Sequence, residues 1–195
     1  MTLFNLLTGI LMLSFFSIAP GNAKIPVSND PLEYNEEETE EFIPWSYDRM
    51  LKWEDFLCEP VKNSDAVALT STTLGITFKY SSGRFVYDIN CSFSKKKSWG
   101  LLKTHYILAH EQAHFDITEI FARKLHQEMR NYRPNFSTLK KDVSAIYESV
   151  IQQEKAFQEL YDGETSHSRK KGKQDEWLGK IEQLLEETDP FADYP

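Results

Sequence analysis

Cysteine is scarce in this chain of 195 residues, and positive charge is in the minority. The two cysteines, Cys58 and Cys91, are too few for a disulfide-rich scaffold, so the fold needs a hydrophobic core. The excess of 30 acidic over 22 basic residues gives a formal charge of −8. This charge argues against nucleic acid as the main partner, because phosphate binding needs a basic surface. With 41% hydrophobic and 27% charged residues, the composition predicts an ordinary globular domain.

No uncharged run after the first 23 residues is as long as the one that they form. The run Leu3–Ala19 is rich in Leu, Phe and Ile, Pro20 ends it, and Gly21-Asn22-Ala23 supplies the small residues that a signal peptidase reads. At about 17 residues the run is short for a bilayer span. We therefore expect residues 1–23 to be a cleaved secretory signal, which leaves no membrane span and an exported, periplasmic or secreted protein. A retained membrane anchor is the alternative.

Export would affect the oxidation state of the two cysteines. An oxidising compartment permits a disulfide between Cys58 and Cys91, and two buried thiols are an equally good interpretation.

The rest of the chain divides into an acidic linker and one domain. Residues 24–41 contain two prolines and a run of glutamates with little to bury, so we expect a linker there and a single domain over residues 42–195. Residues 66–93 are rich in β-branched and aromatic residues, and Ser81-Ser82-Gly83 interrupts them as a hairpin loop would. This segment predicts three to five antiparallel strands.

After Trp99 the hydrophobic period becomes helical. The spacing predicts long helices over residues 101–131 and 139–161, a polar loop over 162–173, and a last amphipathic helix that carries Trp177. Strands followed by helices indicate an α+β domain.

The predicted helix 101–131 carries His110-Glu111-Gln112-Ala113-His114. On a helical wheel both histidines fall within the apolar stripe, and at positions i and i+4 their rings converge on one point, as a zinc site requires. Glu111 lies at the edge of the stripe, where it can reach a water beside the metal without binding the metal. The pattern predicts a Zn²⁺ site; the alternative is two hydrogen-bonded histidines of the core.

A catalytic zinc site needs a third protein ligand. On the wheel, His105, His126 and Glu119 point away from the two histidines. The remaining candidates lie downstream: Glu154 on the inner face of the second helix, and Asp162 and His167 just past its predicted end. Spacing does not decide between Glu154 and His167.

Two segments carry a resemblance to a known family: HEQAHFDITEIFARKL, with Ser98-Trp99 before it, and YDGETSHSRKKGKQDEW after it. From about residue 53 to 185 the chain resembles a group of uncharacterised bacterial exported proteins identified as predicted secreted zinc-dependent proteases of zincin-like fold. The resemblance implies that His110 and His114 are metal ligands, Glu111 the catalytic base, and His167 the third ligand. Asp162 would then contact one of the histidines and orient it without binding the metal. Ala113 and Ser168 stand where the family usually has glycine.

Together these features predict an exported zinc metallohydrolase, most simply a peptidase that acts on a peptide or protein substrate. Zn²⁺ would activate water with Glu111 as the general base. Tyr161 is a candidate to stabilise the oxyanion, although packing is its more ordinary role, and an edge strand would hold an extended peptide beside the helix. The alternative function is a zinc-containing binding protein of the cell envelope without turnover.

Overall fold

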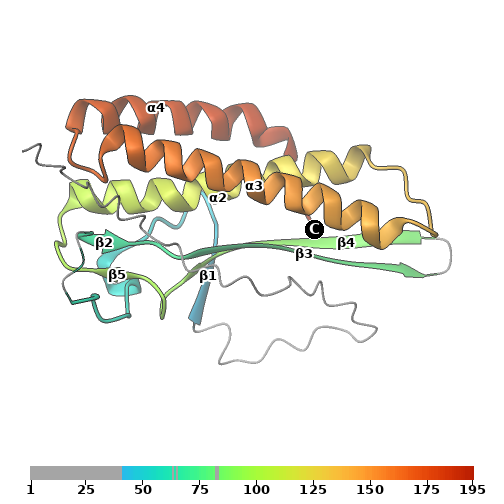
Figure 1. The fold of residues 1–195 in the computed structure, drawn as a ribbon, viewed down its shortest axis with the longest axis horizontal. Helices are drawn as coiled ribbons and strands as arrows, with labels where there is room; N and C mark the ends of the chain where they lie inside the picture. The colour runs from blue at the N-terminus through green and yellow to red at the C-terminus, as the bar shows by residue number, and fades with distance from the viewer. Residues whose placement is uncertain (1–40, 63, 65, 82–83) are drawn as a thin grey trace, which may run out of the picture.

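The computed structural model describes residues 41–195 except 63, 65, 82 and 83 (Figure 1). The expected signal peptide, residues 1–23, lies outside the described residues, as does all of the expected linker except Glu41. Within the described part, no helix combines the length and the apolar character needed to cross a membrane.

The first half of the domain forms two small antiparallel sheets. The larger sheet has three strands in the order β1-β4-β3, and the smaller one pairs β2 with β5. A single turn of 3-10 helix, η1, lies between β1 and β2. The bounds are β1 Phe42–Pro44, η1 Trp53–Asp55, β2 Ala68–Leu69, β3 Thr72–Ser81, β4 Arg84–Ser94 and β5 Trp99–Gly100. The prediction of three to five antiparallel strands is confirmed, and the β3–β4 hairpin closes with Ser81 opposite Arg84, at the predicted loop.

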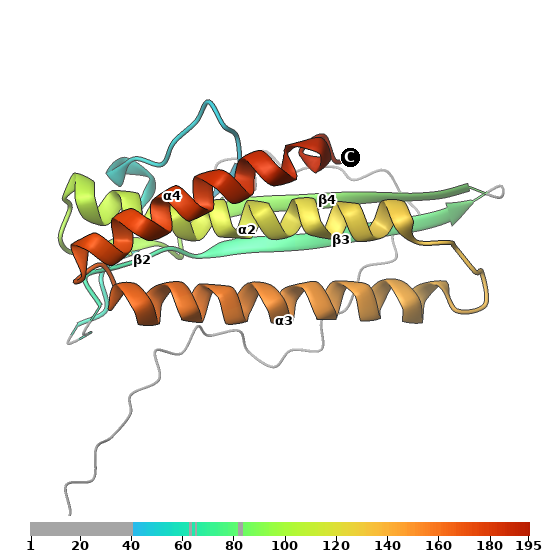
Figure 2. The ribbon, with the colours of Figure 1, turned by 90° about the horizontal axis from the view of Figure 1, so that it is seen from above.

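Three helices follow, which confirms the α+β class. They are α2 (His105–Asn131), α3 (Leu139–Thr165) and α4 (Lys171–Thr188), and a short 3-10 turn, η2 (Asp189–Phe191), follows α4. The helix α2 lies over the β3–β4 hairpin, with α3 along one of its sides and α4 along the other (Figures 1 and 2). It is therefore the central element of the domain.

Besides α4, which begins at Lys171 inside the predicted loop 162–173, two helix ends differ from the sequence prediction. The helix α2 begins only at His105, because the side chain of Thr104 accepts a hydrogen bond from the Ile107 amide and caps it. The C-terminal end of α3 also differs. The helix runs four residues past Tyr161, so that Asp162 is helical and not part of a loop. Gly163 is tolerated in this last turn, and the hydroxyl of Thr165 donates to the carbonyl oxygen of Tyr161 at 2.7 Å.

The core is built around α2. Fully buried aromatic and aliphatic side chains of the sheet and of α2 pack against each other, among them Phe93, Phe115, Ile117 and Leu125. Apolar burial of this kind stabilises the fold by roughly 25 cal/mol per Å² of surface removed from water.

The side of α2 that faces away from the histidines is polar, as the wheel predicts, but it is also buried. Glu119 is only 1% exposed and pairs with Arg123 at 2.8 Å. The Tyr194 hydroxyl donates to the other oxygen of Glu119 at 2.7 Å, and Arg123 donates to the Leu185 carbonyl oxygen at 2.8 Å. These contacts attach α4 and the segment after it to α2.

The cysteines do not form the disulfide that the sequence allowed. Both Cys58 and Cys91 are free thiols. The alternation of β4 turns Cys91 into the core beside Glu119, and this burial raises the pKa of its thiol. Cys58 lies in the loop after η1, where its sulfur contacts the carbonyl oxygen of Glu59 at 3.6 Å. Of the two interpretations that the sequence left open, the structure has the free thiols, with Cys91 buried and Cys58 partly buried.

The buried pair of Glu119 and Arg123 makes a testable prediction. Arg123→Ala would leave the Glu119 carboxylate buried without its cation, so the free energy of unfolding should fall by about 3–5 kcal/mol in denaturant titrations. Lys155→Ala is the control, because it removes an exposed i,i+4 pair with Glu159 and should leave stability close to that of the wild type. Equal stability of the two variants would contradict a structural role for the buried pair.

Candidate metal centre

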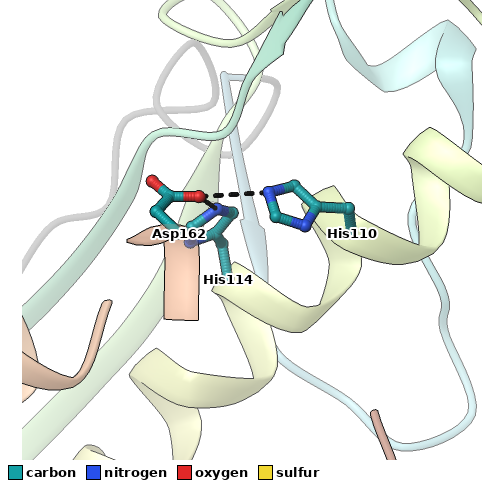
Figure 3. Close-up of side chains that lie close together, drawn as sticks. All are labelled: His110, His114 and Asp162. Carbon is teal, nitrogen blue, oxygen red and sulfur yellow. Dashed lines mark hydrogen bonds and ion pairs between the residues drawn. The ribbon is translucent and has the colours of Figure 1, made fainter. Parts of the chain in front are cut away.

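The predicted metal site lies where the first half of α2 passes the C-terminal end of α3. His110 and His114 project from successive turns of α2, and Asp162 projects toward them from the last turn of α3 (Figure 3). One carboxylate oxygen, Asp162 Oδ1, lies 3.1 Å from His110 Nε2 and 3.2 Å from His114 Nε2. The three side chains each offer one ligand atom, and these atoms all lie within 4.8 Å of one another. They form a group that could hold a metal ion.

Gln158 fixes the orientation of His114. Its Nε2 donates to the backbone carbonyl oxygen of His114 at 2.9 Å, and its Oε1 lies 2.6 Å from His114 Nδ1. Because a carbonyl oxygen only accepts, the amide nitrogen of Gln158 has to face it, and the amide oxygen then faces the ring. His114 therefore carries a hydrogen on Nδ1 and turns Nε2 toward Asp162, as a metal ligand with an oriented ring does.

The pKa values of the two histidines beside Asp162 are shifted in opposite directions. Burial lowers the pKa of His110 to about 4, against the opposing effect of its hydrogen bond to Asp162. Burial also acts to lower the pKa of His114, but the charge of Asp162, the hydrogen bonds to Asp162 and Gln158 and the charge of Glu111 together outweigh it and raise that pKa to about 9. For Asp162, burial alone would raise the pKa, yet the charge of His114 and the hydrogen bonds from the histidines hold it well below its usual range. The carboxylate is thus ionised and ready to bind a cation.

Glu111 lies in the same pocket, one residue after His110. The pocket holds about 80 Å³ and is lined by β2 and its neighbours, by α2 and by the end of α3: Ala66, Val67, Ala68, Leu69, Thr70, His110, Glu111, His114, Asp162, His167 and Ser168. Burial raises the pKa of Glu111, while the charge of His114 and contacts with Thr70 oppose the rise. Glu111 is outside the three-residue group, so its carboxylate is available for chemistry beside a metal.

The third member of the group is Asp162 and not His167, the residue that the resemblance favoured. His167 lines the pocket, but its side chain is 47% exposed and its Nδ1 lies 3.4 Å from Asp162 Oδ1, on the outer side of the group. Asp162, which the resemblance made the orienting partner of a histidine, is thus placed where it could bind a metal itself, because α3 continues far enough to aim it at α2.

Glu154, the other candidate, lies two turns earlier on α3. It contacts Thr118 and Gln158, and burial raises its pKa to about 7 against these contacts. It is not in the three-residue group.

Tyr161 packs behind the histidines. Its ring stacks on His110 with the centroids 4.6 Å apart and meets His114 edge-on at 5.0 Å. Its hydroxyl donates to the carbonyl oxygen of His110 at 3.4 Å, and the side chain is fully buried outside the pocket lining. This placement fits the packing role and not the expected role at an oxyanion.

The residue that sequence reasoning missed is Gln158. It stands four residues before Asp162, so the two share one face of α3 just as His110 and His114 share one face of α2. The sequence contains both i,i+4 pairs, but the second one indicates a shared face only if α3 is taken to include Asp162.

A strained turn follows Asp162. Ser166, His167 and Ser168 all have positive φ, at 52°, 51° and 65°. The left-handed region costs residues other than glycine on the order of 1–3 kcal/mol each when the surroundings impose it. Here the His167 amide donates to the Asp162 carbonyl oxygen at 3.0 Å, which folds the turn back over the end of α3. The φ of Ser168 also gives a physical reason for the glycine that the resemblance led us to expect at this position.

The turn makes a prediction about stability. Ser168→Gly should raise the free energy of unfolding by about 1 kcal/mol, because glycine accepts positive φ and the relieved strain exceeds its entropic cost. Ser144→Gly in the middle of α3 is the matched control and should lower it by about 1 kcal/mol. Thermal unfolding of both variants checks this; a lower melting temperature for Ser168→Gly would show that the turn is not strained at Ser168.

Comparison with known proteins gives one match. Residues 47–168, which include His110, Glu111, His114 and Asp162, match a family described as bacterial protein of unknown function (DUF922). No curated protein and no solved structure matches the chain. The match covers more than half of the chain and all of the candidate metal centre, so the protein belongs to this bacterial family, DUF922.

Proposed function

We propose that the protein is an exported zinc-dependent hydrolase, and specifically a peptidase. The observation that carries the proposal is the convergence of His110 Nε2, His114 Nε2 and Asp162 Oδ1 in a pocket that Glu111 also lines. Export rests on the character of residues 1–23 alone.

The three side chains fit Zn²⁺. Ligand atoms at 2.0–2.2 Å from a tetrahedral Zn²⁺ lie roughly 3.3 Å apart, and the two Nε2–Oδ1 separations here are 3.1 and 3.2 Å. Two histidines and one carboxylate form a ligand set that catalytic zinc sites use, with the fourth position open. A bound Zn²⁺ would act as a Lewis acid that activates water at neutral pH and polarises a carbonyl group.

Glu111 would serve as the general base. It lies in the pocket beside the ligands, and burial raises the pKa of its carboxyl, which brings it closer to neutral pH, where a general base works best. It would take a proton from water and return it to the leaving amine. Gln158 would hold His114 in the tautomer that leaves Nε2 facing the ligand site.

The wall opposite α2 suits an extended peptide. Residues 66–70 line the pocket, and within the described residues β2 pairs with β5 alone. The other edge of β2 can therefore accept the main chain of a substrate as an added strand. This feature favours a peptide over a compact small molecule.

A zinc-containing binding protein without turnover is the rival function, and it would use the same ligands. The two functions differ in what they require of Glu111, because only hydrolysis needs a base beside the metal.

Metal content gives the first test of the proposal. The purified protein should hold close to one equivalent of zinc by elemental analysis, and His114→Ala and Asp162→Ala should both lose it. His105→Ala, at the exposed start of α2, is the control and should keep it. Retention of zinc by Asp162→Ala together with its loss from His167→Ala would exchange the roles of these two residues. Full zinc occupancy in the double His110→Ala/His114→Ala variant would end the proposal.

Substitution of Glu111 gives the second test. Glu111→Gln should keep zinc and the fold, because the residue is not a ligand, while peptide hydrolysis falls by roughly 100- to 10,000-fold through loss of the general base. Glu159→Gln is the control, since it removes an exposed carboxylate from α3 outside the ligand group and should leave turnover near that of the wild type. If Glu111→Gln cleaved peptides as fast as the wild type, the assigned base would be wrong.

A further inference from the structure

The end of the domain far from the metal centre is basic. It is formed by the end of β3, the start of β4 and the turn from α2 into α3, which lie together at one end of the molecule (Figures 1 and 2). The strands β2 and β5 and the start of α2 lie at the other end. Five exposed cationic residues, which we call the basic end, stand here: Lys79, Arg84, Arg133, Lys140 and Lys141. Residues 79–86 and 130–141 contain no acidic residue, although the whole chain carries a charge of −8.

These cations have no internal role that explains them. None of the five forms an ion pair with any other residue in the described part of the chain. Lys140 and Lys141 even occupy the first turn of α3, where the helix dipole disfavours positive charge. The nearest acidic residue along α3, Asp142, already accepts hydrogen bonds from Tyr132 and Thr138.

Exposed aromatic and aliphatic side chains stand among the cations. Phe136 is 77% exposed, and its ring lies 5.6 Å from that of Tyr80, which is 39% exposed. Val86, directly opposite Lys79 in the hairpin, is 41% exposed. Aromatic rings that are exposed beside lysine and arginine are typical of segments that enter the interface between lipid headgroups and acyl chains.

We propose that the basic end docks the protein on an anionic phospholipid surface. The lysines and arginines would contact headgroup phosphates, and Phe136 and Tyr80 would insert at the interface. The chemistry is complementary in both respects, because such a surface offers negative charge over an apolar layer. The proposal goes beyond the proposed hydrolase and does not depend on a metal.

Docking at this end would hold the metal pocket away from the bilayer. His110 and Asn131 are 21 residues apart on α2, which corresponds to roughly 30 Å along a helix. The pocket would then face the aqueous space and not the lipid.

Co-sedimentation with vesicles tests the proposal, using the full chain with the same N-terminus in every variant. The wild type should bind vesicles that contain phosphatidylglycerol far better than pure phosphatidylcholine vesicles, and 0.5 M NaCl should release it. Lys140→Glu/Lys141→Glu should lower the partition coefficient at least tenfold, on the order of the effect of two basic residues at an anionic surface. Phe136→Ser should lower it while leaving the circular dichroism spectrum unchanged.

Lys103→Glu/Lys170→Glu is the matched control, because it makes the same change in charge just before α2 and just before α4, at the other end of the molecule. It should bind anionic vesicles nearly as well as the wild type. Equal loss in the two double variants, or equal binding to both kinds of vesicle, would overturn the proposal. So would binding to a soluble polyanion such as heparin without binding to vesicles.

Discussion

A helix that is covered on every side has to satisfy its polar side chains from its neighbours, and α2 is such a helix. Unpaired polar groups in an apolar interior are costly, and several of those on α2 find a partner on another element, although His110 Nδ1 and the Tyr106 hydroxyl have none among the described residues. On one side Gln158 and Asp162 of α3 meet the two histidines. On the other, Tyr194 donates to Glu119, and Arg123 donates to the Leu185 carbonyl oxygen of α4. The positions of α3, of α4 and of the segment after it follow from these partnerships as much as from apolar packing.

In the candidate metal centre, three histidines share one carboxylate oxygen of Asp162. Asp162 Oδ1 is within 3.4 Å of a nitrogen of each of the three histidines around it. In such an arrangement the histidines compete for a single acceptor, and a divalent cation between them would satisfy the carboxylate and two ring nitrogens at once. The strained turn at 166–168 keeps the third histidine close to this oxygen, so the backbone strain and the side-chain arrangement belong to one feature.

Much of this arrangement was predictable from the sequence, and the part that was not has physical causes. The strands, the hairpin loop and the inward direction of His110 and His114 follow from hydrophobic period, which is a local property. Asp162 was assigned to a loop because residues 162–173 are polar, whereas hydrogen bonding and packing against α2 carry α3 past it. The wheel also gave the polar side of α2 correctly without indicating what would cover Glu119 and Arg123, since a wheel contains no tertiary contacts.

The placement of the ligands on two helices has a thermodynamic consequence. His110 and Asp162 are separated by 52 residues, and His114 and Asp162 by 48. A cation bound to all three would therefore act as a cross-link between segments that are distant in the chain, and its binding energy would be added to the free energy of folding. Under the proposed function, the resistance of the protein to unfolding and to proteolysis would rise with the free zinc concentration around it. An exported protein built in this way would persist where zinc is plentiful and be cleared where zinc is scarce.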